Sequence, residues 1–329
     1  MNNPAPSQNL RERADQPGLA AYPAHADAVP LYGPEMQNNP AELYRTMRRQ
    51  HGSVVPVLLV GDVPAWLVIG YRELHYVTTN PELFSRDNRR WNYWDRIPPD
   101  WPLLPVLAGL PIVDGAEHAR RMRAIHDVFA EEDPFTMRKH TERICDGLID
   151  RFAGRGRADL IAEYATLIPL AVMAADAGLS DEEAGMLLQD LTAMLDAGPE
   201  ALAAGARLQA MLEGAVAEAR AQQSRNLIGR MAAHPVGLTA EEVVGNLLAV
   251  VAASHQATAD WIGNTLRLML TDSRFAVDLF GGRRSISMAM NEVLWEDPPN
   301  PVLAGRWPVR DTQLGGQRIR AGDLLLLGL

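Results

Sequence analysis

Lysine is almost missing from this 329-residue sequence, since Lys139 is its one lysine among 31 basic residues. A phosphate-binding P-loop needs a glycine followed by a lysine, and this pair does not occur, so a Walker-type nucleotide site is excluded. Positive charge is also outweighed, because 41 acidic residues leave the chain with a net charge of −10. Nothing in this balance attracts nucleic acid or anionic lipid. We therefore expect no nucleic-acid partner and no membrane partner.

Cysteine is equally scarce, and Cys145 is its one representative. A single thiol can form neither an intrachain disulfide nor a thiolate cluster, which favours a reducing compartment. Residues 1–28 contain no basic segment followed by an apolar core, so no signal peptide is predicted. The longest apolar stretch, residues 165–179, contains Pro169 and Asp176 and is too short to span a bilayer. The sequence therefore predicts a cytoplasmic protein.

Several common catalytic signatures are missing as well. The eight histidines include no HExxH pattern, and G-x-S-x-G does not occur. The Gly281-Gly282 pair is a turn signal without the G-x-G-x-x-G pattern. A zinc hydrolase, a serine hydrolase and a dinucleotide-binding enzyme therefore have little support, and no metal ligands are predicted.

What is present is the composition of a globular protein with a sizeable core, 47% hydrophobic and 22% charged. Residues 1–30 lack apolar periodicity and are predicted to be a disordered leader, followed by a single domain over residues 31–329. Apolar runs at residues 54–60 and 65–69 around a turn predict a β-hairpin, and residues 313–329 predict further strands. Most of the remainder is predicted to be helical, which gives a mainly α fold with a small β region.

The helices are marked by caps and breakers. Proline just inside and glycine just past residues 41–51 predict a helix there, and Thr239 with Glu242 forms a capping box that begins a helix of about 32 residues, or ~48 Å. Residues 85–111 contain five prolines and are predicted to be a long irregular loop. The other predicted helical stretches are residues 71–79, 117–231 and 285–297.

The long helix changes character in its middle, where small and polar residues interrupt an apolar run. Ala253 and Ser254 have little bulk, so a flat ligand could lie against the helix there, while Gln256 and Thr258 could bind it or ordered water. The alternative is that Ser254, Gln256 and Thr258 only bond neighbouring helices, because buried polar groups are normally satisfied by the fold.

Six segments in this order carry a resemblance to a known family: residues 64–68, 81–85, 118–123, 253–258, 292–295 and 306–323. From about Pro40 to the last residue, the chain resembles the cytochrome P450 family of haem-thiolate monooxygenases. Residues 253–258 are similar to the family's oxygen-binding helix motif, and His118 with the arginines after it resembles its HxxxR helix. The remaining similar segments are the hairpin at residues 64–68, the helix at 81–85, the ExxR-like residues 292–295, and Arg306 with the hairpin at 314–323. The resemblance implies a P450-like fold with haem b as its cofactor.

The resemblance also implies roles for individual residues. His118 and Arg306, with Arg121, would hold the haem propionates through charge-assisted hydrogen bonds, and Ala253 and Ser254 would lie against the haem. Arg120, Arg121 and Arg123 would form a docking patch for an acidic ferredoxin, which together with a ferredoxin reductase would supply electrons. A solvated helix face is the alternative reading of these arginines.

The chain departs from the family at the positions that deliver protons for oxygen activation. The acid and the adjacent threonine of the family are replaced by Gln256 and Ala257, and neither can do that work. Thr258 has a hydroxyl, but one residue along a helix is ~100° of rotation, so it cannot substitute without a local distortion. The catalytic positions Gln256, Ala257 and Thr258 are therefore degenerate.

The ExxR-like segment departs too, because Trp295 stands where arginine would pair with Glu292. Glu292 then needs another partner, because burying an isolated carboxylate destabilises a protein by roughly several kcal/mol. Some actinobacterial members look similar in carrying tryptophan here, and arginine-rich, lysine-poor usage fits such a source.

The family holds haem iron through a cysteine in a late loop, and no cysteine occurs there. Cys145 is preceded by helical residues and is expected to be a buried structural cysteine. Residues 324–329 end the chain in an apolar run with no predicted cover. We expect a C-terminally truncated P450 that lacks its cysteine-loop part and its ligand cysteine, and is inactive in this form.

The resemblance implies oxidation of an apolar small molecule. Segments similar to the family's two access elements would form a substrate lid, with core packing as the alternative for each side chain. The proposed lid residues are Trp91, Trp94, Trp101, Met186, Leu187 and Met194. The alternative function is a non-catalytic protein derived from this family that binds a ligand or a partner.

Overall fold

The computed structural model describes residues 25–34, 36, 40–104, 107, 113–196, 198–273, 275 and 285–328. Backbone contacts divide the chain into two compact units, where the sequence predicts one domain over residues 31–329. Unit 1 consists of Met1–Trp101 and Val302–Leu329, and unit 2 of Pro102–Pro301. The predicted leader lies outside the described residues up to position 24.

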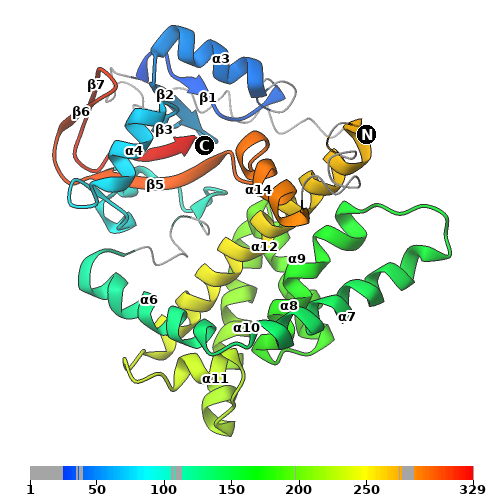
Figure 1. Ribbon diagram of the computed structural model, residues 1–329. Helices are drawn as coiled ribbons and strands as arrows, with labels where there is room; N and C mark the ends of the chain where they lie inside the picture. The colour runs from blue at the N-terminus through cyan, green and yellow to red at the C-terminus, as the bar shows by residue number, and fades with distance from the viewer. Residues whose placement is uncertain are drawn as a thin grey trace, which may run out of the picture. The chain divides into compact units, whose positions relative to one another are not determined.

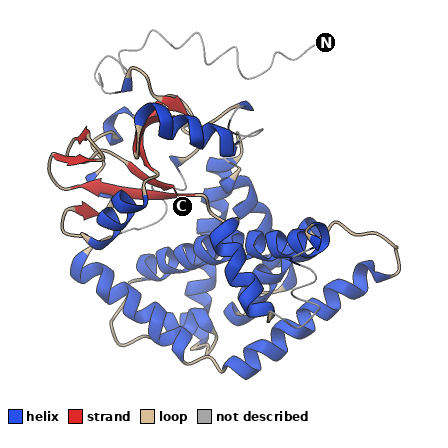
Figure 2. Cartoon of the chain, turned by 45° about the horizontal axis from the view of Figure 1, so that its top comes forward, coloured by secondary structure: helices blue, strands red, loops and turns tan. Residues whose placement is uncertain are grey.

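Unit 1 is built on a six-stranded sheet with the order β1-β2-β3-β8-β5-β4, drawn in red in Figure 2. Its strands are β1 (Val29–Pro30), β2 (Val54–Leu59), β3 (Val63–Val68), β4 (Phe84–Ser85), β5 (Val302–Pro308) and β8 (Leu325–Gly328). The predicted hairpin is confirmed, since β2 and β3 pair antiparallel through a turn in which Asp62 has a positive φ of 58°. β1 pairs parallel with β2, so residues 29–30 are part of the sheet and not of a disordered leader.

The apolar run near the end of the chain is covered, contrary to expectation. Strand β8 pairs parallel with β3 and antiparallel with β5, which places it inside the sheet. The side chains of Leu325 and Leu327 are buried together with Trp66 and Phe84 in the core of unit 1. Burial of leucine on both faces of a central strand explains a continuous apolar run without alternation.

Short elements complete unit 1. Helices α3 (Pro40–His51) and α4 (Tyr71–Thr79) match their predicted ranges, and β6 (Thr312–Leu314) and β7 (Gln317–Ile319) form a second hairpin. The segment predicted as a loop contains the 3₁₀ turns η3 (Asn88–Arg90) and η4 (Trp94–Arg96). This corrects the interpretation of residues 85–111 as wholly irregular, although residues 105, 106 and 108–112 lie outside the described part.

A buried carboxylate fastens this segment to the turn before β8. Asp323 Oδ2 accepts a hydrogen bond from Trp66 Nε1 at 3.1 Å, and its Oδ1 accepts one from Asn92 Nδ2 at 2.9 Å. The backbone N–H of Arg320 also donates to Asp323 Oδ2, at 3.0 Å. Because hydrogen bonds to a charged group are stronger than neutral ones, this network fixes residues that are far apart in sequence.

Unit 2 is helical among its described residues, as Figure 1 shows. Its helices are α6 (Gly115–Ala130), α7 (Pro134–Ala153), α8 (Leu167–Ala177), α9 (Asp181–Leu195), α10 (Ala201–Gln222), α11 (Leu227–Ala232), α12 (Ala240–Thr271) and α14 (Ile286–Glu296), with the π-helical turn η5 (Ile161–Ala165). The capping boxes Ser180–Glu183 and Thr239–Glu242 are both present, which confirms those helix starts. The mainly α fold with a small β region is thus confirmed.

Helix α12 is the central element of unit 2. It packs against α8, α10, α14 and η5, and its apolar residues Val243, Leu247 and Val251 join the main core. One close approach depends on a glycine, because a Cβ at Gly263 would lie 2.6 Å from Ile161 Cδ1 of η5. The core thus covers most of the helix and leaves the polar middle to be accounted for separately.

Candidate functional site

The middle of α12 presents one exposed position, because Ala253 is the one exposed residue between positions 242 and 266. Ala253 is exposed, whereas its neighbours Ala252 and Ser254 are half-buried and Val251 is buried. The helix runs unbroken from Ala240 to Thr271, without a 3₁₀ or π segment. The small side chain of Ala253 therefore leaves the flat, accessible backbone surface that the sequence predicts for a flat ligand.

Ser254 and His255 point to neighbouring helices and not to this open position. Ser254 Oγ lies 2.7 Å from the carbonyl oxygen of Val250 and 2.8 Å from Met173 Sδ on α8. His255 is buried, and its Nε2 lies 3.1 Å from the carbonyl oxygen of Thr166. Burial lowers the pKa of His255, so the ring is neutral near pH 7. The contacts of Ser254 agree with the alternative that it only bonds neighbouring helices. His255 likewise bonds a neighbouring segment.

Gln256 bonds within its own helix. Its Nε2 donates to Asp260 Oδ1 at 2.8 Å, one turn further along α12. Ala257 and Thr258 are half-buried. Because α12 is regular here, Thr258 lies about 140° around the helix from Ala253. The helix has no distortion that would bring the Thr258 hydroxyl to the position of the missing threonine.

Arg121 serves a different place in unit 2. It is buried, and its Nε donates to Asn246 Oδ1 at 3.0 Å while its Nη2 donates to the Glu242 carbonyl oxygen at 3.3 Å. Arg120 forms an ion pair with the Glu242 carboxylate, which lowers the pKa of Glu242. The two arginines therefore join α6 to the start of α12.

These contacts correct the predicted arginine patch. Of its three members, Arg123 is exposed and pairs with Asp127 on its own helix, at 3.6 Å. Arg121 is buried and Arg120 is engaged by Glu242, so the three guanidinium groups do not form one free surface. His118 is half-buried on the same helix, and among the described residues its ring has no hydrogen-bond or ion-pair partner. His118 thus suits the propionate role that Arg121, with its side chain already engaged, fits less well.

Arg306 lies in unit 1, on β5 at a register shift of that strand. Its side chain is buried, and Nη1 donates to the Gly305 carbonyl oxygen at 2.9 Å. Its proposed contact with a propionate stays a prediction.

The ExxR-like residues are on the surface of α14. Trp295 is 84% exposed, and Glu292 is exposed as well. The argument that Glu292 needs a partner because it is buried is therefore wrong, since water can solvate its carboxylate. Because Trp295 is exposed, this tryptophan does not pack into the core at the position where the family has its arginine.

Cys145 lies in the middle of α7, a regular 20-residue helix. It is half-buried and not fully buried as expected. Tyr164 of η5 is its neighbour, and burial together with the Cys145 thiol raises the pKa of Tyr164 to about 12. Cys145 thus contacts Tyr164 within unit 2, and its interpretation as a structural cysteine stays a prediction.

The proposed lid residues are for the most part core residues of their own units. In unit 1, Trp91 and Trp101 are buried, and Trp91 contacts Trp94 and Trp101 with ring centroids 4.8 and 5.9 Å apart. In unit 2, Leu187 and Met194 belong to the main core, while Met186 is 43% exposed. Burial of four of the six side chains agrees with the core-packing alternative for them, and the lid interpretation stays a prediction.

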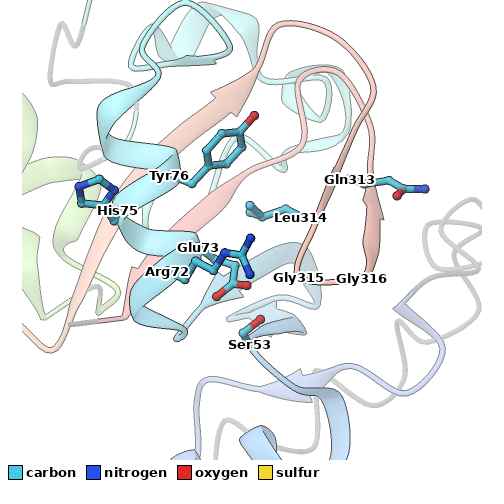
Figure 3. A pocket seen from close by; sticks show the side chains of 9 residues that line it. All are labelled: Ser53, Arg72, Glu73, His75, Tyr76, Gln313, Leu314, Gly315 and Gly316. Atoms are coloured by element: carbon cyan, nitrogen blue, oxygen red, sulfur yellow. The ribbon is translucent and has the colours of Figure 1, made fainter.

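Two features were missed by reasoning from the sequence. One is Asp260, which an i, i+4 spacing from Gln256 could have indicated. The other is an open pocket of about 660 Å³ in unit 1, between α4 and the β6–β7 hairpin, shown in Figure 3. Its lining residues are Ser53, Arg72, Glu73, His75, Tyr76, Gln313, Leu314, Gly315 and Gly316. It contains none of the predicted site residues.

No described helix is both long enough and apolar enough to cross a bilayer. Among the described residues, no group of three or more histidine, cysteine, aspartate or glutamate side chains could hold a metal ion.

Known proteins resemble this chain in sequence and in fold. It is 26% identical to vitamin D(3) 25-hydroxylase of Pseudonocardia autotrophica, over 91% of this chain and 74% of that protein. It is also 26% identical to cytochrome P450 monooxygenase PikC of Streptomyces venezuelae, over 96% of this chain and 76% of the relative. No family model matches the chain.

Solved structures give the same answer for the fold. CYP154C4 from Streptomyces sp. ATCC 11861 superposes with a TM-score of 0.82 at 22% identity, covering 92% of this chain and 76% of that one. CYP154A1 from Streptomyces coelicolor A3(2) superposes with a TM-score of 0.78 at 24% identity, covering 87% and 75%. The mainly helical chain with its mixed sheet therefore has the cytochrome P450 fold. Sequence and fold together relate it to the bacterial cytochrome P450s.

Proposed function

We propose that the chain belongs to a haem-dependent monooxygenase whose haem lies against the Ala253 position of α12. The observation that carries this proposal is the exposed Ala253 among covered residues in the middle of the 32-residue helix α12, in a chain related to bacterial P450 monooxygenases. When bound, haem supplies the oxygen chemistry, and the protein supplies position and electrostatics.

The residues of unit 2 fit such a group in part. Ala253 offers a flat surface, and a protonated His118 would donate to a propionate oxygen. Cys145 of α7 would not hold the haem iron, because it is a half-buried helical residue beside Tyr164. We therefore propose that these 329 residues alone do not form a thiolate-ligated haem protein and are inactive as a monooxygenase.

The substrate proposed is an apolar small molecule. Support comes from the name of one relative, a vitamin D(3) hydroxylase, and from the apolar environment of α12. A ferredoxin and its reductase are the proposed electron donors, and the cytoplasm is the proposed compartment. The broken arginine patch means that ferredoxin docking would need other residues than Arg120 and Arg121.

Haem titration of the purified chain tests the proposal. We expect haem to bind in a one-to-one ratio, and the reduced carbon-monoxide complex to lack the absorption band typical of thiolate-ligated haem. A thiolate band would contradict the proposal about Cys145. Failure to bind haem at all would remove the monooxygenase proposal.

The second candidate is a non-catalytic binding protein derived from the P450 family. The specific observation in its favour is that Gln256 and Ala257 occupy the two proton-delivery positions and Thr258 lies about 140° away from Ala253. Binding of an apolar ligand without any haem binding would support this candidate.

A further inference from the structure

Three side chains follow one stripe of α12. Ala253 and Asp260 are seven residues apart, which places them within about 20° of each other around the helix and about 10 Å apart along it. Gln256 lies between them, within about 60° of Ala253. Ala253 is exposed, and Gln256 and Asp260 are half-buried. The carboxyl group of Asp260 therefore belongs to the same open side of the helix as Ala253.

Asp260 differs from half-buried Glu242 and buried Asp190 in its partners. Glu242 pairs with Arg120, and Asp190 pairs with Arg207 at 2.6 Å. Among the described residues Asp260 has a neutral partner instead, the amide of Gln256, and no ion pair. A carboxyl group without a cation loses less on taking up a proton, because no ion pair is broken.

The surroundings of Asp260 favour the protonated form. Burial raises the pKa of Asp260, while the hydrogen bond from Gln256 and the charge of His255 act in the lowering direction. His255 is itself buried with a lowered pKa, so it carries little positive charge near pH 7. On the elements that pack against α12, Glu163 of η5 is paired with Arg155, and Glu292 of α14 is exposed. Among the described residues, His255 is the one titratable group that acts on Asp260.

We propose that Asp260 is the proton-donating residue of the Ala253 side of α12 and that Gln256 is its positioning residue. The acid form of Asp260 gives a proton to a water molecule on this side, and the Gln256 N–H stabilises the carboxylate that remains. A proton from solvent then restores the acid, so the residue is unchanged over one cycle. This inference rests on the proposed monooxygenase function, and it supplies the proton source that the glutamine at position 256 cannot provide.

Carboxyl-carbon NMR titration of the haem-free chain tests the proton-holding part. Asp260→Asn assigns the signal, and we expect the wild-type group to titrate above the ordinary range of aspartate. Gln256→Leu removes a donor to the carboxylate, so it should shift the titration further upward. Exposed Asp150 provides a matched control, because its signal should not respond to Gln256→Leu. An Asp260 signal that titrates within the ordinary range of aspartate, or does not respond to Gln256→Leu, would overturn the proposal.

The functional part is tested in a haem-loaded form that also carries the family's cysteine loop and turns over a substrate, because the 329 residues alone are proposed to be inactive. Asp260→Asn should lower product formation by about 10²-fold, the lower end for loss of a general acid, and should raise peroxide released per reduced cofactor. Asp150→Asn should leave both unchanged. If the parent turns over and Asp260→Asn behaves like Asp150→Asn, this inference alone fails. If the parent binds no haem, the proposed function itself fails, and the proton has no acceptor reaction.

Discussion

The first and middle thirds of α12 use polar residues in opposite ways. Near its start, Asn246 and the Glu242 carbonyl group receive the buried Arg121 guanidinium, and the Glu242 carboxylate receives Arg120. In its middle, Gln256 and Asp260 bond to each other on the side where Ala253 is exposed. Charge that is paired across two helices fastens the fold, whereas an unpaired acid beside open space remains available for chemistry.

The largest expected effect is on the free energy of unfolding and comes from the start of α12, where Arg121 binds. Arg121→Ala should destabilise the protein by about 3 kcal/mol, because it leaves the buried Asn246 side chain without its donor. Arg123→Ala on the same helix should have little effect, since Arg123 is 72% exposed. Urea unfolding of both variants measures the difference.

The same two variants also test whether the start of α12 only stabilises the fold or belongs to the site as well. If Arg121 holds a haem propionate, as the resemblance implies, Arg121→Ala would weaken haem binding while leaving the urea midpoint of the haem-free chain unchanged. That pattern would show that the start of α12 is part of the site.

A smaller effect is expected at the open middle. In a form of the protein that also carries the family's cysteine loop, Gln256→Glu with Ala257→Thr should improve the product formed per reduced cofactor consumed. We expect a gain of at most about 10-fold, below the ~10²–10⁴ of a general acid placed at an empty site, because Asp260 already supplies a proton. The parent and the double variant are compared on one substrate, with peroxide release measured alongside. A gain of 10³-fold would mean that Asp260 does not do this work, and no gain at all would point to ordered water or Thr258.

The smallest effect is the pH dependence of the Arg120–Glu242 pair. The hydrogen bond from Arg120 lowers the pKa of Glu242 from 4.5, so the pair stabilises the fold above the unfolded-state pKa and loses this contribution as the pH falls through the folded-state value. Glu242→Gln should therefore cost less than about 1 kcal/mol at pH 7 and nothing at strongly acidic pH. Unfolding measured at both pH values gives the result. Glu142→Gln, which removes an exposed pair with Arg138, is the control and should change the stability at pH 7 little.

The comparison also shows which features the sequence predicts. Local signals predicted the starts of α9 and α12 correctly, because a capping box is formed by residues three positions apart. The Arg121–Asn246 contact joins residues 125 positions apart, and no local pattern reports it. The same limit explains the apolar run at β8, which looked uncovered until its pairing with β3 and β5 was known.

The features of the candidate site also differ in whether they depend on local sequence or on packing between distant segments. The small side chain of Ala253 and the helical setting of Cys145 follow from the sequence, because residue size and helix periodicity are local properties. Burial of Trp91, Trp101, Leu187 and Met194 depends on packing between distant segments, so the lid interpretation could not be tested without the structure. Exposure of Trp295 and Glu292 was hidden for the same reason.

Haem binding by two alanine variants tests the central claim, that the Ala253 position of α12 is the ligand face. Ala253→Phe fills the exposed position, whereas Ala203→Phe adds the same bulk at an exposed position of α10. The account predicts that Ala253→Phe weakens haem binding at least about 10-fold, or about 1.4 kcal/mol, and that Ala203→Phe binds like the parent. Equal haem affinity in the two variants and the parent would contradict it.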